Sequence, residues 1–125
     1  MKYLLFIALG GASGAVARFV IANWIHQRWE GHVSVGTLLV NILGPFAIGI
    51  VFVLVVETQL FHPDWRGVIM IGFLGAFTTF STFSLETINL LETGHIFHAL
   101  GYMLASVSLC VFAAGSAIYL ARMIT

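Results

Sequence analysis

The chain has 125 residues, of which 60% are hydrophobic and only 8% are charged. Soluble domains carry roughly 25% charged residues, so this composition predicts an integral membrane protein. The formal net charge is zero, which gives no indication of a nucleic-acid partner, and the single cysteine, Cys110, excludes an internal disulfide.

Four apolar stretches are long enough to cross a bilayer, which needs about 20 helical residues. They cover approximately residues 3–24, 35–56, 66–91 and 96–122. The connections between them are short, so the sequence predicts one all-α, four-span domain over residues 1–125 with no room for a soluble catalytic module. The first stretch lacks the features of a cleaved signal peptide, and we expect it to be retained as the first span.

The third stretch contains the segment GFLGAFTTFSTFS at residues 72–84, with five hydroxyl side chains between Thr78 and Ser84. Glycine and consecutive β-branched threonines weaken a helix locally. In a membrane this is tolerated where the freed backbone groups find protein partners or face a watery cavity. The pattern therefore predicts a third helix that is broken near its middle, beside a site for a small polar species.

Most charged residues lie near the ends of the apolar stretches, and the exceptions are Arg18 and Glu86. Arg18 either reaches the interface, pairs with Glu86 or attracts anions, whereas Glu86 suits either proton-coupled transport or a structural role as hydrogen-bond acceptor. All five histidines fall in loops or at their edges, which argues against a buried proton relay. His95 and His98 have the spacing of a surface metal site, although solvated loop histidines are the better interpretation.

The basic residues indicate little preference for one orientation in the membrane. Lys2, Arg66 and Arg122 would lie on one side, and Arg28, with Arg18 if it extends that way, on the other. Three against two is a weak bias under the positive-inside rule, so insertion in both orientations and an antiparallel homodimer are predicted as a hypothesis. Four spans also form a thin bundle, and enclosing a pathway would require a second copy.

The first span carries small residues at Gly10 and Gly14. Small residues at this spacing allow close helix approach in membranes. They indicate either a dimer seam or packing within one subunit.

Polar side chains also occur in the second and fourth spans. Thr37 and Asn41 are four residues apart and share a helix face. Asn41 is interpreted either as an interhelical hydrogen-bonding group or as an N–H donor to an anion. Tyr102, Ser106 and Cys110 form a stripe in the fourth span, which serves either packing or a pathway.

Phenylalanines recur through the third stretch, including Phe80 and Phe83. Their ring edges carry partial positive charge and can contact an anion without a full countercharge. Hydroxyl and amide donors with such edges suit a small hard anion, and conduction requires binding weak enough to reverse. The carbonyls of a broken helix would suit a cation instead, so the residues by themselves leave the sign of the ion open.

Three segments together, GGASGAVARF at 10–19, GTLLVNILG at 36–44 and GFLGAFTTFSTFSLE at 72–86, closely resemble the Fluc (CrcB) fluoride channel family. The resemblance covers the whole chain in order, length and span count. It implies a fluoride-selective channel, not an enzyme, built as an antiparallel, dual-topology homodimer with two pores in a bacterial inner membrane. Fluoride would leave the cytoplasm passively down its electrochemical gradient, which relieves fluoride toxicity.

The resemblance also implies residues of the fluoride pathway. Phe80 and Phe83 match the phenylalanines whose ring edges contact fluoride, and Asn41 matches the asparagine that donates to the ion. Further matched polar positions are Thr37, Ser81, Thr82, Tyr102, Ser106 and Cys110. Cys110 stands where the family often has a serine, and its thiol is a weaker donor.

The resemblance further implies fixed charges and one bound cation. Arg18 matches an arginine that attracts anions or supports the structure, and Glu86 matches a glutamate whose role stays open. A structural sodium ion at the dimer two-fold axis would be bound by the backbone carbonyls of Gly75 and Thr78. Two carbonyls from each subunit make four hard oxygen ligands.

Three other classes of protein fit the sequence less well. A small multidrug exporter also has four spans and dual topology, but it needs an essential carboxylate in its first span, and residues 3–24 contain none. A membrane assembly subunit would not explain the polar, glycine-containing third span. An enzyme is least compatible, because Cys110 lacks a nearby buried base and Ser81 has no histidine partner in any span.

Overall fold

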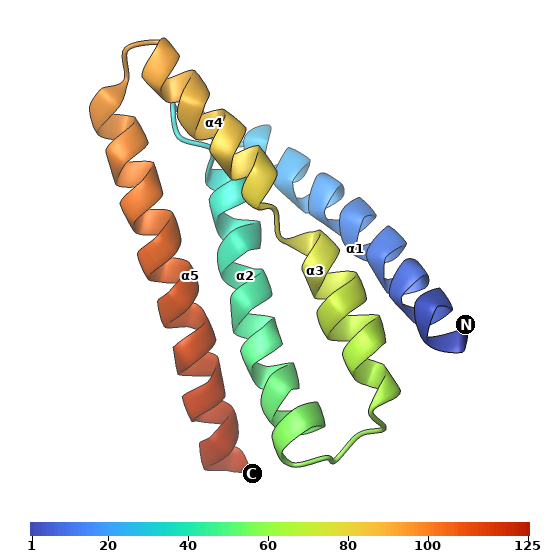
Figure 1. Cartoon of the computed structure of the whole chain (residues 1–125). Coiled ribbons are helices and arrows are strands. Elements are labelled where there is room, and N and C mark those ends of the chain that lie inside the picture. The colour runs from blue at the N-terminus through green and yellow to red at the C-terminus, as the bar shows by residue number, and fades with distance from the viewer.

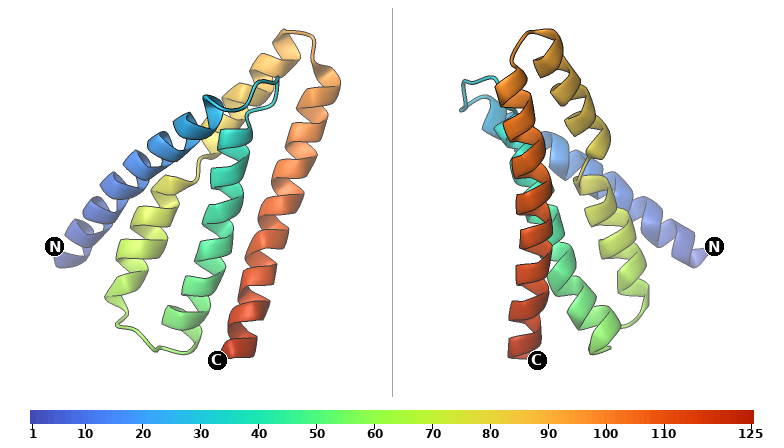
Figure 2. Two further views of the ribbon diagram at one scale, coloured as in Figure 1. Left: turned by 180° about the vertical axis from the view of Figure 1, so that it is seen from behind. Right: turned by 60° about the vertical axis from the view of Figure 1, so that its left-hand side comes forward.

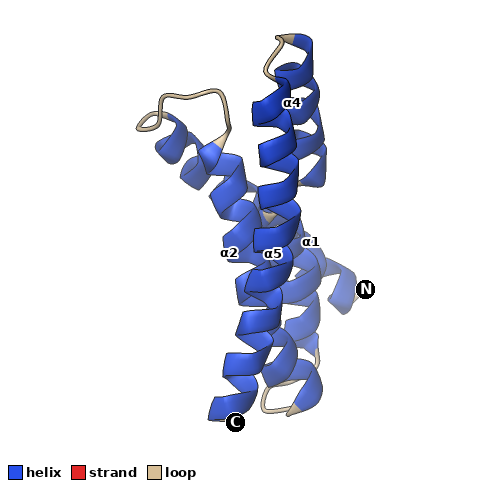
Figure 3. Cartoon of the chain, turned by 90° about the vertical axis from the view of Figure 1, so that its left-hand side faces the viewer, coloured by secondary structure: helices blue, strands red, loops and turns tan.

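The computed structural model describes residues 1–125 and contains only helices and loops (Figures 1 and 3). In chain order the elements are α1 (Lys2–His26), α2 (Val35–Val51), the π-helical η1 (Phe52–Glu57), the π-helical η2 (Arg66–Leu74), α3 (Gly75–Phe77), α4 (Phe80–Glu92) and α5 (Ile96–Ile124). η1 continues α2, and η2, α3 and α4 together form the third apolar stretch.

Four helices are long and apolar enough to cross a membrane: Lys2–His26, Val35–Glu57, Arg66–Glu92 and Ile96–Ile124. They confirm the predicted all-α membrane fold, including the interruption of the third helix between α3 and α4. Their ends lie within about two residues of those expected from hydropathy, because the charged and polar residues that end each apolar run also end the helix.

The α1–α2 loop and the α4–α5 turn lie at one end of the molecule, and the η1–η2 loop and the C-terminus lie at the other (Figures 1 and 2). α2 and α5 run side by side between these ends. At the C-terminal end, Arg122 Nε donates to Glu57 Oε2 across 3.0 Å and joins α5 to η1. Because this ion pair is exposed, it contributes little to stability.

α1 crosses η2 closely because two glycines of α1 face the backbone of η2. Gly10 and Gly14 are the buried residues of α1. A Cβ at Gly10 would overlap the Val68 carbonyl oxygen, and a Cβ at Gly14 would overlap that of Phe73. These two glycines therefore serve packing within the chain, which decides between the two roles that the sequence left open.

Most of the apolar surface of the chain faces outwards. Only 23 of the 125 residues are buried, and they include Val40, Val53 and Tyr102, whose side chains are fully enclosed between the helices. Small residues bring α2 and α5 together, since a Cβ at Gly49 would come within 2.7 Å of the Ala114 carbonyl oxygen. This distribution suits a protein whose solvent is the lipid hydrocarbon.

Replacing Gly14 by Ala should destabilise the contact between α1 and η2 by about 1–3 kcal/mol, because rigid backbone atoms leave no room for the added methyl group. The matched control is Gly11→Ala in the same helix, where a Cβ would lie an ordinary 3.9 Å from the Gly72 carbonyl. Thermal unfolding of the detergent-solubilised protein measures both. Equal midpoints for the two variants would contradict the packing described here.

Candidate functional site

The break in the third span consists of two residues with extended backbone. Thr78 has ψ 156°, and Thr79 has φ −148° and ψ 113°. Thr79 is the N-cap of α4, because its Oγ1 accepts a hydrogen bond from the Thr82 amide at 3.2 Å. The helix therefore stops at α3, and α4 starts again at Phe80 with its first turn capped.

Asn41 of α2 clamps the break with both ends of its side-chain amide. Its Oδ1 accepts from the Thr79 backbone amide at 2.8 Å, and its Nδ2 donates to the Thr79 carbonyl at 3.0 Å. Both backbone groups of Thr79 are thus paired, although neither takes part in a helix. An asparagine NH₂ has two N–H donors, so one N–H of Asn41 remains after this pairing.

The same hydrogen bonds divert the donors that would otherwise close the helix over the break. In an α-helix the Gly75 carbonyl would accept from the Thr79 amide, and the Thr78 carbonyl from the Thr82 amide. The Thr79 amide is instead bonded to Asn41, and the Thr82 amide to the Thr79 hydroxyl. The carbonyls of Gly75 and Thr78 are therefore free of their helical partners.

Arg18 binds a third carbonyl of this region. Its Nε donates to the Ala76 carbonyl oxygen across 3.0 Å. Carbonyl groups at a helix C-terminus carry partial negative charge, which the guanidinium complements. Ion pairs occur only between His62 and Asp64 and between Arg122 and Glu57, so Arg18 is not paired with Glu86.

Aromatic rings follow the break on α4. The ring centroids of Phe80 and Phe83 are 5.5 Å apart with an interplanar angle of 53°, and those of Phe83 and Tyr102 are 5.0 Å apart at 56°. These tilts turn ring edges rather than parallel faces toward neighbouring groups. Phe83 is buried, whereas Phe80 is 76% exposed on the surface of the single chain.

The Glu86 carboxylate accepts hydrogen bonds from two neighbouring helices. The Tyr102 hydroxyl donates to Glu86 Oε1 at 2.8 Å, and Thr37 Oγ1 donates to Glu86 Oε2 at 3.0 Å. Glu86 therefore joins α2, α4 and α5 by charge-assisted hydrogen bonds. The structural role that the sequence left open for Glu86 thus has two specific partners.

Two further polar side chains of α5, Ser106 and Cys110, follow Tyr102 along the helix. The Cys110 thiol donates to the Asn41 carbonyl at 2.8 Å. Ser106 is buried, and its hydroxyl has no hydrogen-bond partner in the chain. Because buried polar groups are normally paired, the Ser106 hydroxyl is available to a ligand.

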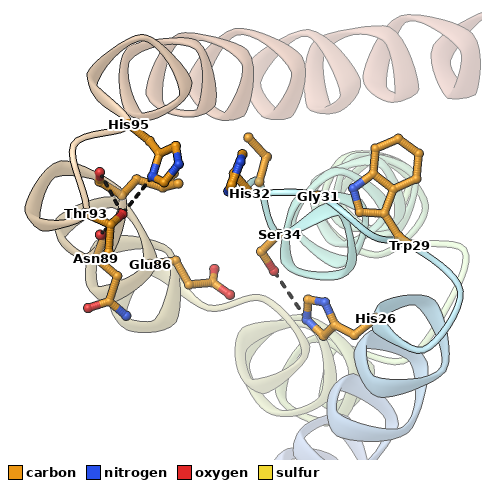
Figure 4. A pocket seen from close by; sticks show the side chains of 11 residues that line it. His26, Trp29, Gly31, His32, Ser34, Glu86, Asn89, Thr93 and His95 are labelled. Atoms are coloured by element: carbon orange, nitrogen blue, oxygen red, sulfur yellow. Dashed lines mark hydrogen bonds between the residues drawn. The ribbon is translucent and has the colours of Figure 1, made fainter.

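Three cavities, which we name the aromatic, arginine and outer cavities, follow one another along these residues. The aromatic cavity, about 290 Å³, is lined by Asn41, Thr79, Phe80, Phe83, Ser106 and Cys110, among others. The arginine cavity, about 190 Å³, includes Arg18, Thr37, Thr79, Thr82 and Glu86. The outer cavity, about 440 Å³, includes His26, His32, Glu86 and His95 (Figure 4). Neighbouring cavities share residues, with Thr79 common to the first two and Glu86 to the last two.

Comparison with known proteins places the chain in a family. The family model described as "CrcB-like protein, Camphor Resistance (CrcB)" matches residues 5–118. The chain belongs to the CrcB-like family. A relative from Hahella chejuensis is 48% identical over 99% of this chain and 98% of its own, and one from Magnetococcus marinus is 47% identical over 95% and 97%. Both relatives carry the name fluoride-specific ion channel FluC.

Within this CrcB-like chain, the residues selected from the sequence converge on two of the cavities. Those lining the aromatic cavity are Asn41, Thr78, Phe80, Phe83, Ser106 and Cys110, and those lining the arginine cavity are Arg18, Thr37, Thr82 and Glu86. Tyr102 reaches the second group through its bond to Glu86. Ser81 is exposed, and its hydroxyl lies 3.3 Å from that of Thr79.

Thr79, which lines both cavities and caps α4, is a residue of the site that the sequence did not predict. A signal for it exists, because a threonine directly before a restarting helix is a preferred N-cap residue. The sequence also did not predict that His26 and Asn23 line the arginine cavity from α1. No motif marks those two residues, since their position depends on how α1 crosses α2.

Replacing Tyr102 by Phe should lower stability by about 1.5–3 kcal/mol, because hydrogen bonds to charged groups contribute about this much and Glu86 would lose one donor. Tyr119→Phe is the matched control, since that side chain is 66% exposed. Thermal unfolding in detergent compares the two. A Tyr102→Phe midpoint as high as that of Tyr119→Phe would contradict a stabilising role for the Tyr102–Glu86 bond.

Proposed function

We propose that this protein is a fluoride-selective channel that lets fluoride leave the cytoplasm down its electrochemical gradient and so confers fluoride resistance. The proposal is supported by the name of the two relatives, which match the chain over nearly their whole length. It places the protein in the cytoplasmic membrane of a bacterium. The role is transport rather than catalysis.

The observation that carries the proposal is the set of donors in the aromatic cavity. The Ser106 hydroxyl is buried without a partner, and one N–H of Asn41 remains beyond its clamp on Thr79. Neither donor is charged, and no Lys, Arg, Asp or Glu lines this cavity. Uncharged donors hold a small anion loosely enough for release, as conduction requires.

Two further features of the same cavity favour an anion over a cation. Phe80 and Phe83 both line the cavity with their rings tilted by 53° to each other, and phenylalanine ring edges carry partial positive charge. α4 also begins at Phe80, which lines the cavity, and the unpaired amides of a first helical turn carry partial positive charge. A small hard anion with a high charge density gains most from such groups. The pathway therefore runs past Phe80, Phe83, Asn41 and Ser106.

We further propose a structural sodium ion bound by the backbone carbonyls of Gly75 and Thr78. These two carbonyls are released from the helix because their usual donors bond elsewhere. Carbonyl oxygens are hard ligands that suit an alkali or alkaline-earth cation. One chain contributes two such oxygens, so a second copy would complete four. The ion would hold the two subunits together and is not the transported species.

An antiparallel homodimer with two pores completes the proposal. Phe80 is 76% exposed in the single chain, and polar groups of the aromatic cavity lie beside it. Polar groups facing lipid are costly, so a protein surface is needed to cover them. The chain contains only five Lys and Arg residues, too few to impose one orientation strongly. Two copies in opposite orientations would form two pathways, and both copies would contribute residues to each pathway.

Reconstitution into proteoliposomes tests the channel directly, because fluoride should be released far faster than chloride. Asn41→Asp should reduce the fluoride flux roughly tenfold or more, since a hydrogen bond to a charged group is worth about 1.5–3 kcal/mol. Phe80→Ile should also reduce the flux, because isoleucine has no ring edge of partial positive charge. Phe112→Ile is the matched control, since Phe112 is 72% exposed and lies outside the aromatic cavity. Equal fluoride and chloride fluxes would refute the channel, and unchanged flux in both variants would refute the pathway.

Removal of sodium tests the structural cation. Protein purified and reconstituted throughout with a large organic cation in place of sodium should lose most of its fluoride flux and part of its dimer, because the freed carbonyls would repel one another. Adding back sodium should restore both properties. Flux and dimer content that are the same with and without sodium would contradict the proposed site.

A further inference from the structure

Three histidine rings gather at the end of the molecule where the α1–α2 loop meets the start of α5. His32 belongs to that loop, His95 precedes α5, and His98 lies in its first turn. The ring centroids are separated by 3.9 Å for His32–His95, 5.1 Å for His32–His98 and 5.6 Å for His95–His98. We call these three residues the histidine triad. The sequence alone did not predict it, because His32 is far from the other two along the chain.

The histidine triad lies beside the outer cavity, at the end of the molecule that carries the α1–α2 loop and the α4–α5 turn (Figure 1). His32 and His95 line this cavity, and the Glu86 carboxylate lies at its other side (Figure 4). Glu86 also lines the arginine cavity, which in turn shares Thr79 with the aromatic cavity. An ion that enters past the triad thus lies at the start of three neighbouring cavities that share lining residues. Any charge on the triad acts on ions at the start of that series.

The geometry of the triad does not suit a metal ion. Ligands of a metal must point their donor nitrogens at one place, whereas the rings of His32 and His95 lie against each other, with centroids 3.9 Å apart and a tilt of 32°. No group of three or more His, Cys, Asp or Glu side chains converges in a metal-binding arrangement. Moreover, the Thr93 hydroxyl lies 2.8 Å from His95 Nδ1 and occupies one ring nitrogen. Proton binding is the chemistry left to the triad.

The pKa of His95 depends on burial and on the two other histidines of the triad. Desolvation, followed by the positive charges of His32 and His98, lowers the pKa of His95 below its usual value. His95 is therefore mostly neutral at neutral pH and gains positive charge as the pH falls. The other titratable groups around the outer cavity are His26 of α1, which lies 3.3 Å from the Ser34 hydroxyl, and Glu86 of α4, which is bonded to Thr37 and Tyr102.

We propose that His32, His95 and His98 form a proton-dependent binding site for a small monovalent anion beside the outer cavity. In the proposed channel this anion is fluoride, so the inference rests on that function. Like charges at these separations oppose one another, and an anion between the rings offsets that repulsion. Anion binding and protonation therefore strengthen each other, as linkage requires. Lower pH places more fluoride at the entrance, and higher pH removes it.

Fluoride efflux from proteoliposomes, measured with equal pH on both sides between about pH 5.5 and 7.5, tests the site across the histidine range. The flux of the natural protein should rise on the order of three- to tenfold toward the acidic end, as charge at an entrance raises the local ion concentration. Protein-free vesicles correct for the leak of undissociated hydrogen fluoride through lipid. A double variant, His32→Gln with His95→Gln, should lose most of this rise.

Two further variants make the experiment decisive. His62→Gln changes an exposed histidine in the η1–η2 loop and should keep the full pH dependence. His32→Lys supplies a permanent charge beside the outer cavity and should give high flux that varies little with pH. A rise that persists in the double variant, or a natural protein whose flux does not vary with pH, would overturn the site. Absence of fluoride flux at every pH would instead overturn the proposed channel itself.

Discussion

The double hydrogen bond between the Asn41 side chain and the backbone of Thr79 is the interaction on which the site depends. A broken helix inside a bilayer leaves amide and carbonyl groups without partners, and each unpaired group costs several kcal/mol in hydrocarbon. Asn41 is suited to this position because its amide donates and accepts at once, at 3.0 and 2.8 Å. Aspartate offers only acceptors and leucine offers neither. The clamp thus permits an extended segment where a helix would otherwise continue.

The two intramembrane charges are held by partners other than the clamp. Arg18 is held on the Ala76 carbonyl, and Glu86 is held by Thr37 and Tyr102, so both intramembrane charges have partners away from the aromatic cavity. The aromatic cavity keeps uncharged donors and ring edges. A full positive charge there would bind an anion too tightly for rapid release. Separating the charged residues from the cavity is therefore compatible with fast passage of an anion.

The number and type of the helices follow from hydropathy, and the position of the break follows from the run of glycine and threonine in residues 72–84. Both are local properties, so the sequence is sufficient to predict them. The partner of Arg18 depends on how α1 crosses the third span, and the sequence left three alternatives open. The histidine triad has the same origin, because His32 meets His95 only when two connections come together at one end of the bundle. Thr79 combines both situations. The local sequence indicates its role as the N-cap of α4, but only the packing of the helices places it in the lining of two cavities.

The two helix ends that meet at the break differ in electrostatic character, which supports the proposal of a cation site and an anion pathway in one short segment. η2 and α3 form a half-helix whose carbonyl end reaches the break, and α4 forms a half-helix whose amide end leaves it. The dipoles of the two half-helices place partial negative charge on the first side and partial positive charge on the second. The extended residues Thr78 and Thr79 separate those ends, so the carbonyls of Gly75 and Thr78 and the donors beside Phe80 do not neutralise one another. A continuous helix would pair these same groups with each other and provide neither environment. The break is therefore the feature that allows residues 72–84 to present backbone carbonyls free of their helical partners and anion-compatible side chains within about two helical turns.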